Sequence, residues 1–129
     1  MLKAVNIKDA LKNRPVLQSR SQATTEAEAE AAFARLHTYE DGGVFAGRFI
    51  GQSPWERHRN GDELVQVLEG RAVLSVLIDG GQEQLELSAG TVAIVPRGCW
   101  HRFDAPDGVT LLTKTPQPTD HTWDLEDLE

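Results

Sequence analysis

The chain has 129 residues, 40% hydrophobic and 26% charged, a mix typical of one compact globular domain rather than of a disordered or fibrous chain. Its formal net charge is −7, and no basic stretch that would neutralise phosphates is present, which argues against nucleic-acid binding. The only cysteine, Cys99, excludes an internal disulfide and a multi-cysteine zinc site.

No apolar run approaches the roughly 18 to 20 residues of a membrane helix. The first residues, MLKAVNIKD, lack the apolar block of a secretory signal. A chain with one cysteine also suits a reducing compartment. We therefore expect a cytoplasmic protein without membrane contact.

Residues 1–42 are expected to form an N-terminal arm and one short helix that pack on the remainder. Pro15 prevents one continuous helix over residues 1–23. Thr25 and Glu28 have the spacing of a capping box, and an alanine-rich segment without Gly or Pro follows. We predict a helix over residues 25–36, which the glycines after Asp41 end.

Residues 43–115 alternate between short β-prone runs and turn residues, with no helical pattern between them. Strand spacing of this kind predicts an antiparallel sandwich or barrel. The turns include Asn-Gly and Asp-Gly pairs, which supply the left-handed residues of tight hairpins. The expected strands are 44–50, 55–59, 63–68, 72–78, 84–87, 91–95 and 109–115, and the turns between them include Glu69-Gly70 and Pro106-Asp107-Gly108.

Residues 116–129 are expected to form an acidic C-terminal tail. Residues 103–129 carry one lysine against seven acidic residues and so hold six of the seven net negative charges. Such acidity is usually a solvating feature. Open sheet edges are commonly covered by pairing, so we expect a homodimer.

The residues with metal-binding chemistry lie in the β-prone part of the chain. Glu56 and His58 are two residues apart and share one face of a strand. After Asn60-Gly61 the chain reverses, so Glu63 begins an antiparallel return strand, and a bend at residues 96–98 can aim His101 inward. Imidazoles and carboxylates together suit divalent Fe, Mn, Ni or Zn, and two histidines with one carboxylate leave coordination positions open.

Two spaced motifs in this region resemble those of the cupin superfamily. The first is Glu56-Arg57-His58-Arg59-Asn60-Gly61-Asp62-Glu63, then six residues and Gly70; the second is Gly90, five residues, Pro96-Arg97-Gly98, two residues and His101. Glu56 replaces the first histidine of the family's His-x-His pair, and Ala105 replaces the closing asparagine. The resemblance implies a double-stranded β-helix (a jelly-roll or cupin barrel) with one short N-terminal helix. It also implies metal ligation by His58, Glu63 and His101, with Glu56 as a possible fourth ligand.

Each of these residues has a simpler interpretation. His58 and His101 could be hydrogen-bonded barrel histidines without a metal, and Glu56 could be a surface carboxylate paired with Arg57 or Arg59, whose side chains are expected to face solvent. We expect the remaining candidates to be structural or surface residues, with Cys99 and the tryptophans in the core and the arginines stabilising loops: His37, His121, Cys99, Trp55, Trp100, Arg97 and Arg102.

The fold by itself leaves several functions open, because one fold hosts many activities. The first is a mononuclear metal-dependent oxidoreductase or isomerase that converts a small organic molecule, with dioxygenase-like and sugar-isomerase-like chemistry both in range. The alternative is a non-catalytic sensor that binds a small ligand or a metal. A structural or storage role without metal is a third.

Overall fold

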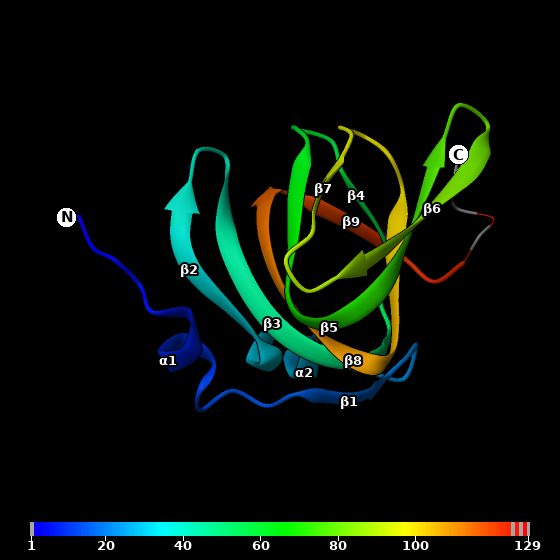
Figure 1. The fold of residues 1–129 in the computed structure, drawn as a ribbon. Helices are drawn as coiled ribbons and strands as arrows, with labels where there is room; N and C mark the ends of the chain where they lie inside the picture. The colour runs from blue at the N-terminus through cyan, green and yellow to red at the C-terminus, as the bar shows by residue number, and fades with distance from the viewer. Residues whose placement is uncertain (1, 125, 127, 129) are drawn as a thin grey trace.

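The computed structural model describes residues 2–124, 126 and 128. The elements run in the order α1 (Ile7–Leu11), β1 (Leu17–Arg20), α2 (Glu26–Ala32), β2 (Phe33–Tyr39), β3 (Gly42–Gln52), β4 (Trp55–His58), β5 (Glu63–Ile78), β6 (Gly81–Ser88), β7 (Val92–Val95), β8 (His101–Pro116) and β9 (Thr119–Thr122) (Figure 1). None of the helices in the described part of the chain is long and apolar enough to cross a membrane.

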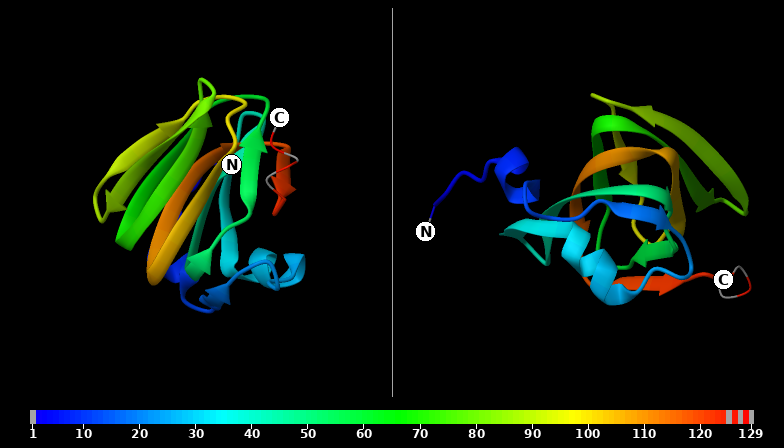
Figure 2. Two further views of the ribbon diagram at one scale, coloured as in Figure 1. Left: turned by 90° about the vertical axis from the view of Figure 1, so that its right-hand side faces the viewer. Right: turned by 90° about the horizontal axis from the view of Figure 1, so that it is seen from below.

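The strands form one sheet that curls around a common interior. The two long strands β5 and β8 pair with each other, β8 also pairs with β3 and β4, and β5 carries β6 and β7 on its other side. Strands β1 and β2 both pair with β3, and β9 pairs with β4. Figures 1 and 2 show the curled sheet, with both helices and β1 at one end of it. This architecture confirms the predicted all-β barrel with little helix.

The interior of the curled sheet is filled by the larger of two apolar clusters. Phe49, Val65, Val67 and Leu74 are fully buried there. The smaller cluster lies under α1, where Leu11 packs with buried residues of β2 and β3. Burial of these side chains supplies the main free energy that holds the barrel together.

The predicted helix over residues 25–36 is correct at its start and wrong at its end. The capping box forms as expected, because the Thr25 hydroxyl accepts from the Glu28 amide and the Glu28 carboxylate accepts from the Thr25 amide. The helix ends at Ala32, and Phe33 begins β2. The ring of Phe33 covers Gly47 on the neighbouring strand so closely that an added methyl group would lie 2.2 Å from it. Tertiary packing of this kind overrides local helix propensity.

Two of the predicted turns are bends inside long strands. Gly70 belongs to β5 and Gly108 to β8, where both have left-handed φ angles of +77° and +97°. The two glycines face each other, since a methyl group on Gly70 would lie 2.3 Å from the Gly108 carbonyl oxygen. Register shifts in the β5–β8 pairing flank this point. The paired bends curl the sheet without interrupting it.

The structure confirms the predicted β5–β6 hairpin and adds a strand within the predicted C-terminal tail. Asp79 and Gly80 have φ angles of +49° and +76° and form the tight β5–β6 hairpin that the Asp-Gly pair predicts. Within the segment expected to be a solvated tail, residues 119–122 form strand β9, whose pairing with β4 ties them to the sheet.

Candidate metal centre

Three strand ends bring the predicted ligands together. His58 is the last residue of β4, Glu63 is the first of β5 and His101 is the first of β8. The prediction that β5 returns antiparallel beside β4 is wrong, because β4 pairs with β8 and β9 while β5 pairs with β6, β7 and β8. The turn after β4 nevertheless carries Glu63 back to His58.

The three side chains form a buried cluster, which we call the histidine cluster: His58, Glu63 and His101. The Nε2 atom of His58 lies 3.2 Å from Glu63 Oε2, and the Nε2 atom of His101 lies 3.1 Å from Glu63 Oε1. The exposed fractions of the three residues are 4%, 5% and 0%. One candidate ligand atom from each residue lies within 4.8 Å of the other two. The separations of 3.2 and 3.1 Å are those of donor atoms that share one ion at about 2.0 to 2.2 Å from each.

The short contacts within the histidine cluster are not hydrogen bonds. His58 Nε2, His101 Nε2 and Glu63 Oε1 are buried, and none has a hydrogen-bond partner with acceptable geometry among the residues that the structure describes. Leaving buried polar atoms unpaired is costly, and native structures rarely do so without a reason. Two imidazole nitrogens and a carboxylate oxygen with this geometry are the donors that divalent Fe, Mn, Ni and Zn accept. The residues present therefore fit such an ion.

Contacts on the far side of each ligand hold it in place. The Nδ1 atom of His101 donates to the Cys99 carbonyl oxygen at 3.1 Å, so whenever the imidazole is neutral its acceptor nitrogen is Nε2. The Nδ1 atom of His58 lies 3.0 Å from Thr119 Oγ1, and the Thr115 hydroxyl donates to Glu63 Oε2 at 2.6 Å. Partners of this type orient metal ligands in known sites.

The electrostatics of the histidine cluster favour an ionised glutamate. Burial acts to raise the pKa of Glu63, but the contacts with His101 and His58 outweigh it and lower the pKa to about 2. Burial acts to lower the pKa of His101, but the contact with Glu63, the charge of Glu56 and the Cys99 carbonyl together outweigh it and raise that pKa. The carboxylate is therefore present as an anion at neutral pH, as metal ligation requires.

Glu56 lies beside the histidine cluster and outside it. As predicted, Glu56 and His58 face the same cavity, but the Glu56 carboxylate contacts His121, with 3.2 Å between Oε2 and Nε2. The alternative pairing of Glu56 with Arg57 or Arg59 is wrong, because both arginines contact Asp120 at 3.0 and 2.6 Å instead. Burial acts to raise the pKa of Glu56, but the His121 contact together with the charges of His101 and Arg20 outweighs it and lowers the pKa.

His121 was expected to be a structural or surface residue; it is exposed, and it also lines the cavity that Glu56 faces. Its contact with Glu56 raises its pKa. Because β9 pairs with β4, His121 lies opposite Glu56 and Thr119 lies opposite His58. No motif in the sequence points to either residue, since both depend on a long-range strand pairing.

The other candidates have mostly the expected roles. Cys99 packs partly buried against the main core, and burial raises its thiol pKa. Arg97 stabilises a loop by donating to the Arg59 carbonyl oxygen, and His37 lies half-buried in β2, outside the histidine cluster. The expectation that Arg57 faces solvent is wrong, because it is half-buried between Asp120 and the Trp100 ring. The remaining residues are structural: Trp55 and Trp100 are buried, and Arg102 stacks on Trp55.

A cavity of about 290 Å³ adjoins the histidine cluster, and we call it the histidine cavity. His58 and Glu63 line it, and Glu56, Arg20 and His121 also face it. Much of its remaining wall is apolar, formed by Phe33, Phe45, Phe49, Phe103 and Leu111. The combination of an apolar enclosure with a few convergent polar groups is typical of small-molecule sites.

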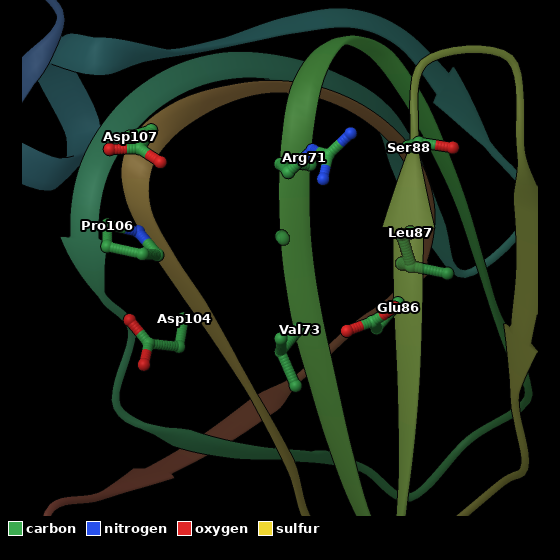
Figure 3. Close-up of a pocket in the computed structure, with 9 residues that line it drawn as sticks. Arg71, Val73, Glu86, Leu87, Ser88, Asp104, Pro106 and Asp107 are labelled. Atoms are coloured by element: carbon green, nitrogen blue, oxygen red, sulfur yellow. The ribbon is translucent and has the colours of Figure 1, made fainter.

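A second cavity, of about 270 Å³, lies among β5, β6 and β8, and we call it the outer cavity. Figure 3 shows that its charged side chains, Arg71, Glu86, Asp104 and Asp107, come from these three strands. All four are exposed. No histidine lines this cavity.

Comparison with known proteins gives concordant results. Residues 50–113 match the family described as the cupin domain. The chain is 30% identical over 100 residues to an acireductone dioxygenase of Rhodopseudomonas palustris (strain TIE-1), an alignment that covers 78% of this chain and 52% of that protein. The chain thus spans about half the length of this relative.

Solved structures share the fold at lower sequence identity. A hydroquinone 1,2-dioxygenase in complex with Cd²⁺ and 4-hydroxybenzonitrile superposes with a TM-score of 0.56 at 21% identity, over 65% of this chain and 63% of that one. A cupin-2 domain protein from Shewanella frigidimarina NCIMB 400 gives a TM-score of 0.52 at 19% identity, over 70% and 80% of the two chains. With both motifs in register, a matching family segment and this shared fold, the chain belongs to the cupin superfamily.

Proposed function

We propose that the chain binds one divalent transition metal at His58, Glu63 and His101 and catalyses the oxidation of a small organic molecule by O₂. The observation that carries the proposal is the convergence of three buried, unpaired ligand atoms beside an apolar cavity. Two histidines with one carboxylate are the ligand set of many non-haem iron oxygenases. The similarity to an acireductone dioxygenase supports the same reaction class.

In this proposal the ion would polarise an oxygen atom of the substrate and supply redox chemistry when bound. The chain's own residues have three tasks. The Cys99 carbonyl and the Thr119 hydroxyl keep the imidazoles of His101 and His58 turned toward the ion. Thr115 holds the Glu63 carboxylate by its Oε2 atom, and the phenylalanine walls exclude water from the substrate.

Glu56 has a second task in this proposal. Its carboxylate, held by His121, faces the cavity and can accept a hydrogen bond from a substrate hydroxyl. Its Oε2 atom contacts His121, and it has no atom among the three grouped ligand atoms. We therefore expect Glu56→Gln to retain the metal and Glu56→His to bind it with four ligands; loss of the metal from Glu56→Gln, measured by elemental analysis, would instead identify Glu56 as a ligand.

The test of the proposed function is metal content followed by oxygen uptake. Purified protein, reconstituted in turn with Fe, Mn, Ni and Zn and then dialysed, is expected to retain one ion per chain. His101→Ala should lose the ion, whereas His37→Ala, which removes a histidine outside the histidine cluster, should retain it. The iron form should then consume oxygen with a small organic substrate from a panel of enediols and phenols. A wild-type protein that retains no ion would refute the proposal.

A further inference from the structure

Arg20 lines the histidine cavity, and the proposed reaction gives its positive charge no role. It is the last residue of β1 and lies half-buried in the cavity wall. Its guanidinium carbon lies 4.7 Å from the centre of the Phe49 ring and 5.4 Å from that of Phe33. Within the described part of the chain, its guanidinium has no hydrogen bond and no carboxylate within 4.0 Å.

This arrangement leaves the donors of Arg20 available to a ligand. A guanidinium carries five N–H donors in one plane, and packing against aromatic rings satisfies none of them. The other half-buried or buried arginines with aromatic neighbours have polar partners: Arg57 contacts Asp120, and Arg102 donates to the Ser53 carbonyl. Arg20 is thus partly withdrawn from water without such a partner, and burial lowers its pKa while Glu56 partly offsets that effect.

The backbone is shaped to place Arg20 at this point. Ser19, directly before it, has a φ of +51°, a left-handed conformation that is uncommon for a residue with a side chain. Gly51 on the neighbouring strand has a φ of +115°, and a methyl group there would lie 2.3 Å from the Arg20 carbonyl oxygen and 2.6 Å from its amide nitrogen. Only glycine permits this approach. Unusual backbone of this kind is often retained where function requires it.

The charges around the cavity favour an anionic ligand. Four glutamates line it: Glu26 and Glu30 are exposed, so water screens their charges, whereas Glu56 and Glu63 are partly or fully buried. With a divalent ion bound at the histidine cluster, the charges of the ion and Arg20 together exceed those of Glu56 and Glu63. The planar donor array of arginine matches a carboxylate in two parallel hydrogen bonds. The phenylalanine walls suit the apolar body of such a ligand.

We propose that Arg20 binds the carboxylate of a small organic acid whose other end lies at the histidine cluster and whose apolar body packs on Phe33, Phe49 and Phe103. The inference rests on the proposed function and narrows its substrate class to carboxylic acids. The competing explanation is that Arg20 only balances the charge of Glu56. The two explanations differ in whether the affinity for a carboxylate ligand depends on Arg20.

The experiment uses benzoate as the probe and benzamide as its uncharged counterpart. Zinc is the loaded ion, because it does not change oxidation state. Calorimetric titration of the zinc-loaded wild type should show tighter binding of benzoate than of benzamide. Arg20→Gln should weaken benzoate by about 10- to 100-fold, the effect of losing a charge-assisted hydrogen-bond pair, and leave benzamide unchanged. Arg20→Lys should recover part of the loss.

Arg35→Gln is the matched control. Arg35 also stacks on a phenylalanine, with 5.2 Å between its guanidinium carbon and the centre of the Phe45 ring, but it is exposed and does not line the cavity. This variant removes the same charge and the same type of ring contact. Its benzoate affinity should equal that of the wild type.

Zinc content, measured for every protein, separates the two proposals. A wild type that retains none of the four ions overturns the proposed function and this inference with it; if another of these ions is retained and zinc is not, the titrations use that ion. Full zinc content together with wild-type benzoate affinity in Arg20→Gln overturns this inference alone, as does equal wild-type affinity for benzoate and benzamide. Because variants can fold poorly, labelling of wild-type arginines with phenylglyoxal provides a second measurement. Benzoate should protect Arg20 and not Arg35 from modification, and unprotected Arg20 would overturn the inference.

Discussion

The histidine cavity and the outer cavity are almost equal in volume, at about 290 and 270 Å³, but their polar groups differ in kind. The charged side chains of the outer cavity are exposed, so water can satisfy each of them. The histidine cavity adjoins three buried polar atoms that make no hydrogen bond within the described part of the chain. Volume therefore does not distinguish a functional cavity here, whereas buried ligand atoms without hydrogen bonds do.

The two cavities share their walls. Strand β5 contributes Glu63 to one and Arg71 to the other, and β8 contributes Thr115 to one and Asp104 to the other. The bend at Gly70 and Gly108 lies between these positions on both strands. For each substitution in the histidine cavity, a similar substitution in the outer cavity or elsewhere on the same strand can therefore serve as a control.

The largest difference between the cavities should come from a glutamate in each. Glu63→Gln keeps the size of the side chain and removes the charged ligand, so metal affinity should fall by more than about 100-fold, beyond the 10- to 100-fold typical of an outer partner. Glu86→Gln, in the outer cavity, should leave the affinity unchanged. Metal competition with a chromogenic chelator measures both; equal affinities would remove Glu63 from the ligand set.

A second difference concerns the glycines near each cavity. Gly51→Ala places a methyl group against the Arg20 backbone at a left-handed φ, so we expect a loss of about 3 kcal/mol in the free energy of unfolding. Gly90 lies two residues beyond Ser88 of the outer cavity and also has a left-handed φ, of +90°, but a methyl group there meets nothing within 4 Å. Gly90→Ala should cost only about 1 kcal/mol. Urea unfolding that gives equal losses would exclude the steric explanation.

The metal-free protein should show a pH dependence that belongs to the histidine cavity. The pKa of Glu63 is about 2 in the folded chain against an ordinary value of 4.5, so its stabilisation is present above pH 4.5 and is lost as the pH falls toward 2. We expect the free energy of unfolding to fall by about 3 kcal/mol through this window.

The raised pKa of His101 acts in the opposite direction. Its contribution is present below its ordinary value of 6.5 and is lost as the pH rises through the raised value. Denaturant titrations of wild type, Glu63→Gln and Glu86→Gln across this range test both effects. Glu63→Gln should lose the acid-side slope and Glu86→Gln should keep it; a slope that survives in Glu63→Gln would assign it to other groups.

A smaller effect is expected from the threonine behind Glu63. Thr115→Val removes the hydrogen bond to Glu63 Oε2 while keeping the shape of the side chain, and metal affinity should fall about 10-fold. Thr110→Val on the same strand replaces a threonine that is also buried but lies away from the histidine cluster. Isothermal titration should find the metal affinity of Thr110→Val unchanged. A similar loss of metal affinity in both variants would indicate a general effect on β8.

The smallest effect is expected in the outer cavity itself. Arg71→Gln removes the cation that lies among Glu86, Asp104 and Asp107, all of them exposed (Figure 3). Because water and salt screen such charges, we expect the free energy of unfolding to change by no more than about 0.5 kcal/mol and metal affinity not at all. A large loss in either measurement, by thermal unfolding or metal titration, would give this cavity a role of its own.

Much of the fold and the three clustered residues could be predicted from sequence, because their signals are local. The capping box at Thr25 and the Asp79-Gly80 hairpin are short patterns with one dominant structural solution. Motif spacing identified His58, Glu63 and His101. Their closeness in space is what the structure adds.

The failures share a physical cause, which is contact between distant parts of the chain. Phe33 leaves the helix because its ring fits over Gly47, and no window around residue 33 contains that information. Gly70 supplies the same left-handed backbone to a bend inside a strand as to a turn, so the residue type alone does not separate the two. Arg20 and His121 reach the cavity through strand pairings that lie outside both motifs.

Successive residues of the four-residue strand β9 have two alternating roles. Thr119 and His121 contact His58 and Glu56 of the histidine cavity, while Asp120 between them holds Arg57 and Arg59. The anchoring aspartate can therefore stay fixed while its two neighbours are exchanged. We therefore expect substitutions at Thr119 and His121 to change the surroundings of His58 and Glu56, while Asp120 keeps the strand in place and every motif residue stays the same.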